Sequence, residues 1–271
     1  MSGTANRIDA KFSSLRGESR KAFIAYVCAC DPDVDKSLEV FAGLDAAGTD
    51  IVELGVPFSD PLADGIVNQM AAQRALEAGA TTPKVLELIR RIREISQTPI
   101  VLFTYLNPVY TYGFRKFFKD AAQAGADGIL LLDLPPDEAP LNEELCDAGE
   151  SLKQIRLISP TTPPDRIKEI ASGAEGFVYY VSREGVTGVQ SSLAESIAGQ
   201  VELIKRATDV PVAVGFGISS PHQAKTVAAM ADGVVVGSAI VRLVGESGES
   251  SKLGDRVRDL VKPLVEAVKS V

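Results

Sequence analysis

Eight short segments recur along the chain, each four or five residues long and apolar throughout or nearly so, and they constrain the fold more than any other feature. Apolar runs without polar alternation are typical of parallel strands that are buried on both faces. We therefore expect strands at 23–27, 51–54, 100–103, 128–132, 155–158, 177–181, 210–214 and 233–236.

Segments of helical length with amphipathic spacing lie between these runs. Together with the strands they predict an α/β fold, a single (β/α)8 TIM barrel that spans residues 1–271 as one domain. A short helix after the eighth strand is expected to help bind phosphate, and an extra N-terminal helix is expected at 7–15. The other expected helices are 34–47, 83–95, 114–124, 138–148, 164–171, 193–207, 221–229 and 253–268.

A doubly wound open sheet is the main alternative to the barrel. Such sheets usually carry a glycine-rich dinucleotide-binding turn after the first strand. Here that position reads Cys28-Ala29-Cys30-Asp31-Pro32, which has no such turn and favours the barrel.

The composition excludes several classes of function. A formal net charge of −8 argues against nucleic acid as a partner, because phosphate backbones need clustered Lys and Arg. Three cysteines (Cys28, Cys30 and Cys146) and one histidine, His222, predict reduced thiols and no metal site. The polar N-terminus and the lack of a run of about 20 apolar residues predict a cytoplasmic protein with no membrane partner.

Two carboxylates stand where a barrel carries its chemistry, at the C-terminal end of a strand and in the loop that follows. Glu53 lies within the second apolar run, and Asp64 lies in the proline- and glycine-rich loop after it. Partial burial at the barrel mouth would raise the pKa of Glu53 and suit it to acid–base work. The alternatives are a strand-end Glu facing solvent and an Asp in an ordinary turn.

The last two strands end in glycine-rich turns, 215–221 and 237–238, each followed by a probable helix start. Glycines allow close approach of a ligand, and the first N–H groups of a helix lack partners within it. This pairing predicts a phosphate site after strands seven and eight. The long polar loop at 182–192 has the composition of a lid, although an ordinary loop is the alternative.

Five motifs in the chain resemble the tryptophan synthase α-subunit family. They are Glu53–Gly65 (ELGVPFSDPLADG), Tyr105–Pro108 (YLNP), Asp133–Pro136 (DLPP), Ser182–Gly188 (SREGVTG) and Val214–Pro221 (VGFGISSP), and the matches run from about Phe23 to Val241. The resemblance implies cleavage of indole-3-glycerol phosphate to indole and glyceraldehyde 3-phosphate, a retro-aldol reaction that needs no cofactor.

The resemblance also implies roles for individual residues. Glu53 matches the acid–base residue, and Asp64 matches the acceptor of the indole N–H. The remaining matches are substrate-binding residues (Phe103, Tyr105, Tyr179, Thr187 and Phe216) and phosphate-binding residues (Gly188, Gly217, Gly237 and Ser238). The implied partner is a tryptophan synthase β subunit in an α2β2 assembly, contacted through Asp60, Asn107 and Pro135.

The chain departs from the family pattern at four positions near the pocket. Ile66 and Asn68 follow Asp64 where the family commonly has proline and, at Asn68, an aliphatic residue. Cys28 and Cys30 replace the common Thr and Gly. Two alternative functions stay open on the sequence: a catalytically weakened α subunit that mainly activates its β partner, and another phosphosugar isomerase or epimerase on the same fold.

Overall fold

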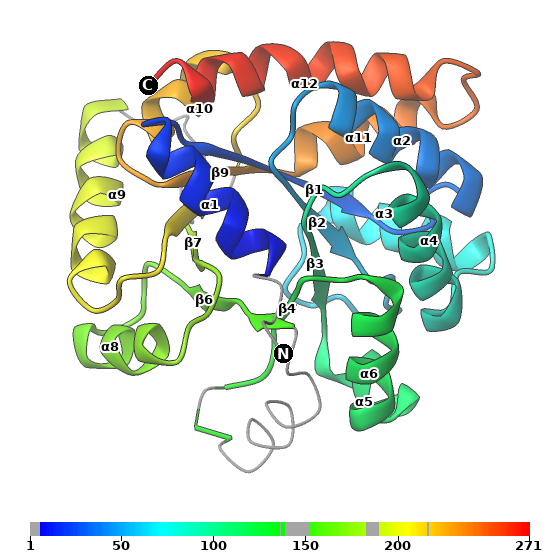
Figure 1. Cartoon of the computed structure of the whole chain (residues 1–271), viewed down its shortest axis with the longest axis horizontal. Coiled ribbons are helices and arrows are strands. Elements are labelled where there is room, and N and C mark those ends of the chain that lie inside the picture. The colour runs from blue at the N-terminus through cyan, green and yellow to red at the C-terminus, as the bar shows by residue number, and fades with distance from the viewer. Residues whose placement is uncertain (1–5, 136, 139–151, 183–189, 216) are drawn as a thin grey trace.

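The strands of the structure, a computed structural model, form one parallel sheet that closes into a barrel (Figure 1). The structure describes residues 6–135, 137–138, 152–182, 190–215 and 217–271. The described strands are β1 (Ala22–Cys28), β2 (Ile51–Gly55), β3 (Ile100–Thr104), β4 (Gly128–Leu131), β5 (Lys153–Gln154), β6 (Arg156–Ile158), β7 (Val178–Val181), β8 (Val212–Gly215) and β9 (Gly233–Val236).

The barrel closes through its fifth strand, which is divided into β5 and β6 on either side of Ile155. The sheet order is β5-β4-β3-β2-β1-β9-β8-β7-β6, so β5 pairs with β4 while β6 pairs with β7. The nine assigned strands therefore occupy the eight positions that the apolar runs predicted. The predicted (β/α)8 barrel is confirmed.

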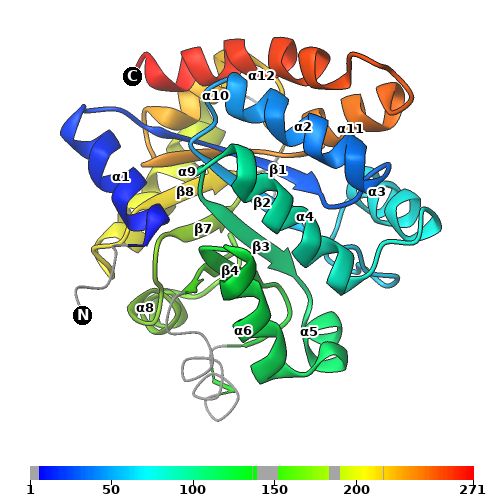
Figure 2. The same cartoon turned by 45° about the vertical axis from the view of Figure 1, so that its right-hand side comes forward.

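Helices surround the strands, as Figure 2 shows for α2, α4 and α6 outside β1, β2 and β3. Sequence signals fix several helix starts: Thr81 caps α4, and Ser220 with Gln223 forms a capping box at the start of α10. The described helices are α1 (Arg7–Gly17), α2 (Val34–Ala46), α3 (Ile66–Glu77), α4 (Thr82–Ile95), α5 (Leu106–Tyr112), α6 (Phe114–Ala124), α8 (Pro164–Ser172), α9 (Gln190–Lys205), α10 (Pro221–Ala228), α11 (Ser238–Ser247) and α12 (Leu253–Lys269).

Two of these helices, α3 and α5, were not expected. The side chains that α3 buries are alanines (Ala71, Ala72 and Ala75), which give a weak periodic signal. Most of the helix expected at 138–148 lies outside the described residues. The extra N-terminal helix and the helix after the last strand are present as α1 and α11.

The extra helix α1 closes the N-terminal end of the barrel and lies within the ring of outer helices in Figure 1. Its buried side chains Ile8, Phe12 and Leu15 pack into the barrel interior. There they meet apolar side chains from every barrel strand or its immediate approach: Ala22, Ile24, Ile51, Val101, Leu130, Ile155, Phe177, Ala213 and Val235.

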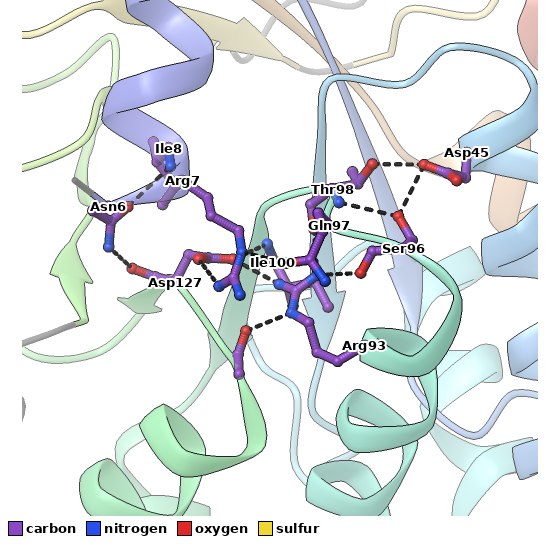
Figure 3. Close-up of polar contacts among 11 residues, drawn as sticks. Asn6, Arg7, Ile8, Asp45, Arg93, Ser96, Gln97, Thr98, Ile100 and Asp127 are labelled. Atoms are coloured by element: carbon purple, nitrogen blue, oxygen red, sulfur yellow. Dashed lines mark hydrogen bonds and ion pairs between the residues drawn. The ribbon is translucent and has the colours of Figure 1, made fainter. Parts of the chain in front are cut away.

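A buried carboxylate, Asp127, joins α1 to the barrel (Figure 3). Arg7 donates to Asp127 Oδ1 at 2.8 Å, and Arg93 donates to Oδ2 at 2.7 Å. The backbone N–H of Ile100, at the start of β3, also donates to Oδ2 at 2.8 Å. Helix α1 and the segment that joins α4 to β3, which are far apart in the sequence, therefore meet on one side chain that is only 3% exposed.

A carboxylate that bonds to the preceding strand in this way occurs four times in all at this end of the barrel. Asp50, Asp127, Glu175 and Asp232 each precede a strand, and each carboxylate accepts a hydrogen bond from a backbone N–H in the preceding strand. The donors are Phe23 for Asp50, Ile100 for Asp127, Gln154 for Glu175 and Val212 for Asp232. We call these four acids the base carboxylates.

Candidate active site

A cavity of about 260 Å³ opens at the carboxyl ends of the strands. Its wall is formed by β1, β2, β3, β7, β9, the start of α3, the turn after β8 and the start of α11. The lining residues are Tyr26, Glu53, Gly65, Ile66, Val67, Asn68, Phe103, Tyr179, Gly217, Val235, Gly237 and Ser238. Six of the residues predicted for the site, Glu53, Phe103, Tyr179, Gly217, Gly237 and Ser238, therefore share one cavity.

Glu53 is the fully buried acid of this cavity, with 0% of its surface exposed. Among the described residues neither carboxylate oxygen has a hydrogen-bond partner. Removal from water without a compensating charge disfavours the ionised form, and burial raises the pKa of Glu53 to about 8. At neutral pH this group is mainly protonated, so it can give up a proton and take it back.

Asp64 is held from two sides in the loop between β2 and α3. Tyr105 Oη donates to Asp64 Oδ2 at 2.8 Å, and Asn68 Nδ2 donates to Oδ1 at 3.5 Å. Burial raises the pKa of Asp64, while these two hydrogen bonds lower it in part. Asp64 does not line the cavity itself, but it directly precedes Gly65, which does.

Two tyrosines of the cavity wall, Tyr26 and Tyr179, each pack closely against a glycine on a neighbouring strand. A Cβ placed on Gly55 would lie 2.5 Å from Tyr26 Oη, and one on Gly215 would lie 2.6 Å from Tyr179 Oη. Burial raises the pKa of both phenols well above the usual value, and the nearby Glu53 raises both further. Both hydroxyls therefore stay protonated and remain hydrogen-bond donors.

Tyr26 is a polar residue of the cavity wall that was not predicted from the sequence, and the apolar Val67 and Val235 were not predicted either. In the parallel register Tyr26 lies opposite Glu53, and its ring packs edge-on to Phe103 with centroids 5.0 Å apart. The sequence shows a tyrosine inside the first apolar run. Its place opposite Glu53, however, depends on how β1 pairs with β2, which the sequence of β1 alone does not determine.

Two of the residues expected at the phosphate, Gly237 and Ser238, lie at the start of α11. Gly237 is the N-cap of this ten-residue helix, and Ser238 is its first residue. Gly217 has φ of +68°, a backbone conformation that side chains other than glycine rarely adopt. The first N–H groups of a helix have no acceptor within it, so they can bind an anion at this end of the cavity.

The chain was compared with known proteins. A family model described as "Tryptophan synthase alpha chain" matches residues 12–269. The chain belongs to the tryptophan synthase alpha chain family. As an alpha chain it is a carbon–carbon lyase that acts on indole-3-glycerol phosphate, so the predicted family and function are confirmed and the weakened-subunit alternative is not favoured.

Individual relatives agree over nearly their whole length. The tryptophan synthase alpha chain of Opitutus terrae is 48% identical over 97% of this chain and 99% of its own. That of Geobacter sulfurreducens is also 48% identical, with the same shares covered. The crystal structure of the alpha subunit from Legionella pneumophila superposes with a TM-score of 0.89 at 35% identity, covering 99% of this chain and all of that one.

Three alpha-chain residues expected at the partner surface, Asp60, Asn107 and Pro135, are exposed and line no part of the cavity. Asp60 follows β2, Asn107 is on α5, and Pro135 follows β4. Family membership implies a β-subunit partner for this chain.

Thr187, Gly188 and Phe216, which were expected in the site, lie outside the described residues. No helix in the described part of the chain is long and apolar enough to cross a membrane.

The alpha chain's two described cysteines, Cys28 and Cys30, are buried free thiols. Neither lines the cavity, although Tyr26 on the same strand does. Tyr105 also lies off the cavity wall and acts on the site through its hydrogen bond to Asp64. Ile66 and Asn68, the other two departures from the family pattern, both line the cavity.

Proposed function

We propose that Glu53 is the acid–base residue for cleavage of indole-3-glycerol phosphate. The observation that carries the proposal is a fully buried carboxyl group whose pKa is raised to about 8 at the wall of the cavity. The protonated carboxyl gives its proton to indole C3. The carboxylate then takes the proton of the glycerol hydroxyl while the C–C bond breaks, its electron pair returns to the ring, and an aldehyde forms.

Asp64 is proposed to accept a hydrogen bond from the indole N–H. Positive charge develops on the ring nitrogen when C3 is protonated, and a nearby carboxylate stabilises that charge. The hydrogen bonds from Tyr105 and Asn68 support the proposal, because they favour an ionised and oriented Asp64. Phe103 and Tyr179 would form the walls that contact the substrate.

The phosphate group is proposed to bind Gly217, Gly237 and Ser238, with Gly188 as a further ligand. Support comes from the helix start at Ser238 and from the place of the first three residues in the cavity wall that holds Glu53. Thr187 and Phe216 are proposed as further substrate-binding residues on the strength of the sequence motifs.

The assembly is proposed to be a cytoplasmic α2β2 heterotetramer, made of two copies of this single-domain α chain and two β subunits. Asp60, Asn107 and Pro135 would contact the β subunit, and their exposure away from the cavity supports this. Further support comes from the similarity to a solved structure of Mycobacterium tuberculosis tryptophan synthase, at 36% identity and a TM-score of 0.87.

One assay tests the proposed function. The purified chain is mixed with indole-3-glycerol phosphate, and released indole is measured with and without a β subunit. The assignment of Glu53 is supported if the parent releases indole and the Glu53→Gln variant does not. No indole release by the folded parent chain, even with the β subunit present, would overturn it.

A further inference from the structure

Asn68 brings a primary amide into the wall of the proposed substrate cavity. It lies on the first turn of α3, four residues after Asp64, and it lines the cavity together with Glu53 and Tyr179. Apolar and aromatic side chains surround it in that wall, among them Val67 and Phe103. The family resemblance leads us to expect an aliphatic residue here, so the amide is a departure from the expected pattern.

One half of the Asn68 amide already has a partner. Its Nδ2 donates to Asp64 Oδ1 at 3.5 Å, while Tyr105 holds the other carboxylate oxygen at 2.8 Å. The contact from Asn68 is long for a hydrogen bond, and the terminal torsion of asparagine is broad. The amide can therefore turn by a modest angle without losing its place beside Asp64.

The carbonyl oxygen of the Asn68 amide has no such partner among the described residues. This oxygen, Oδ1, is also shielded from solvent. A buried carbonyl oxygen without a donor costs free energy, and that cost is recovered when a ligand supplies the donor. In a planar amide the oxygen lies next to the nitrogen that reaches Asp64, so a ring held by Asp64 comes close to both groups.

We propose that Asn68 is a specificity-determining residue that accepts a hydrogen bond from a hydroxyl or amino group on the rim of a bound indole ring. Asp64 binds the ring nitrogen in the proposed function, on which this inference rests. Asn68 then adds a second polar contact at the ring. The pocket consequently favours indoles that carry a donor group over indoles of the same size that do not.

The test compares matched ligands by isothermal titration calorimetry on the full chain. Indole is titrated first, followed by hydroxyindoles and by methylindoles substituted at the same ring positions. The methyl group has a size close to that of the hydroxyl and donates no hydrogen bond. The proteins are the parent, Asn68→Leu, which keeps the number of side-chain heavy atoms and the branch at Cγ but removes the amide, and Asn68→Gln, which retains an amide.

At one ring position or more, we expect the parent to bind the hydroxyindole roughly three- to tenfold more tightly than the methylindole. Asn68→Leu should abolish or reverse that ratio, which compares two ligands on the same protein and so separates the contact at the ring rim from any change in Asp64 that alters affinity for plain indole. Asn68→Gln should recover part of the ratio, a result that a loss of packing alone would not produce.

Two results would overturn the inference, and they are distinguishable. In the first, indole binds both proteins while the ratio of hydroxyindole to methylindole affinity is the same in the parent and in Asn68→Leu. In that case Asn68 makes no hydrogen bond to a group on the ring, and the proposed function still stands. If plain indole does not bind the folded parent at all, the proposed function fails and the inference falls with it.

Discussion

Tyr105 joins two loops at the barrel mouth through a single hydroxyl group. It donates to Asp64 Oδ2 at 2.8 Å and accepts from the backbone N–H of Ala63 at 3.0 Å. The loop after β2 is therefore fastened to the end of β3 both at a side chain and at the backbone. The carboxylate proposed to bind the indole ring owes its orientation to a residue 41 positions away in the sequence.

Replacement of Tyr105 by Phe removes both of these hydrogen bonds and keeps the ring. Hydrogen bonds to charged groups contribute about 1.5–3 kcal/mol, so we expect kcat/KM to fall roughly ten- to a hundredfold. Steady-state kinetics of indole release measure the loss. Tyr110→Phe, at a tyrosine that is 71% exposed, is the matched control and should behave as the parent does.

Glu53→Gln should lower kcat by about two to four orders of magnitude, the usual contribution of a general acid–base residue. The amide is close in size to the acid, so circular dichroism should show an intact fold. Glu87→Gln, at an exposed glutamate on α4, serves as the control. Turnover near the parent's in Glu53→Gln would remove Glu53 from the mechanism.

The raised pKa of Glu53 also makes stability depend on pH. Its value is about 8 in the folded chain, against an ordinary value of 4.5. Between these two values the folded state binds more protons than the unfolded state, so this group lowers stability as the pH rises. Glu53→Gln lacks the effect, and its stability relative to the parent should increase by a few kcal/mol, to order of magnitude, from pH 5 to pH 8.

Urea denaturation at several pH values measures this difference. A constant gap between the two proteins across that range would mean that Glu53 titrates near its ordinary pKa. The same titration should appear in kcat/KM, which we expect to decline above about pH 8 as the acid loses its proton.

The contact between Tyr26 and Gly55 predicts a coupled pair of substitutions. Gly55→Ala would place a methyl group 2.5 Å from Tyr26 Oη, and such overpacking typically costs about 1–3 kcal/mol. In a Tyr26→Phe background the oxygen is absent, so the same change should cost less. A double-mutant cycle of unfolding free energies measures the coupling, and strictly additive effects would contradict it.

Asp127 should affect stability and leave the chemistry unchanged, because it lies at the opposite end of the barrel from the cavity. Asp127→Ala leaves Arg93, whose side chain is 11% exposed, without its carboxylate partner, and loss of one partner of a buried ion pair costs about 3–5 kcal/mol. The control is Asp259→Ala, since its exposed pair with Arg258 should contribute about 0–1 kcal/mol. Per folded molecule, kcat should match the parent's in both variants.

The sequence predicted the strands well because both faces of most strands, among them β1, β2, β8 and β9, are buried, which leaves a continuous apolar run. Helix α5 was missed because its seven residues include Asn107-Pro108 and show no amphipathic period. That helix depends on tertiary contacts, among them a hydrogen bond of 2.6 Å from the backbone N–H of Leu106 to Asp133. Such contacts join strands that no local pattern relates.

The same limit applies to the site. Glu53 was predictable because a carboxylate inside an apolar run stands out, and its position at the end of β2 fixed where it would lie. The contribution of Tyr26 was not predictable, since it follows from the register of β1 against β2. The hydrogen bond from Asn68 to Asp64 required both the helical start of α3 and the fold of the preceding loop.

The four base carboxylates divide the barrel into quarters, each with two neighbouring strands joined by an acid that belongs to the quarter itself. Each acid also pairs with a lysine or arginine, such as Lys205 for Asp232 and Lys153 for Glu175. At the end opposite the cavity, the barrel is therefore built from four similar two-strand units. A cut in the chain between two quarters would leave every one of these carboxylates on the same fragment as its own donor strand.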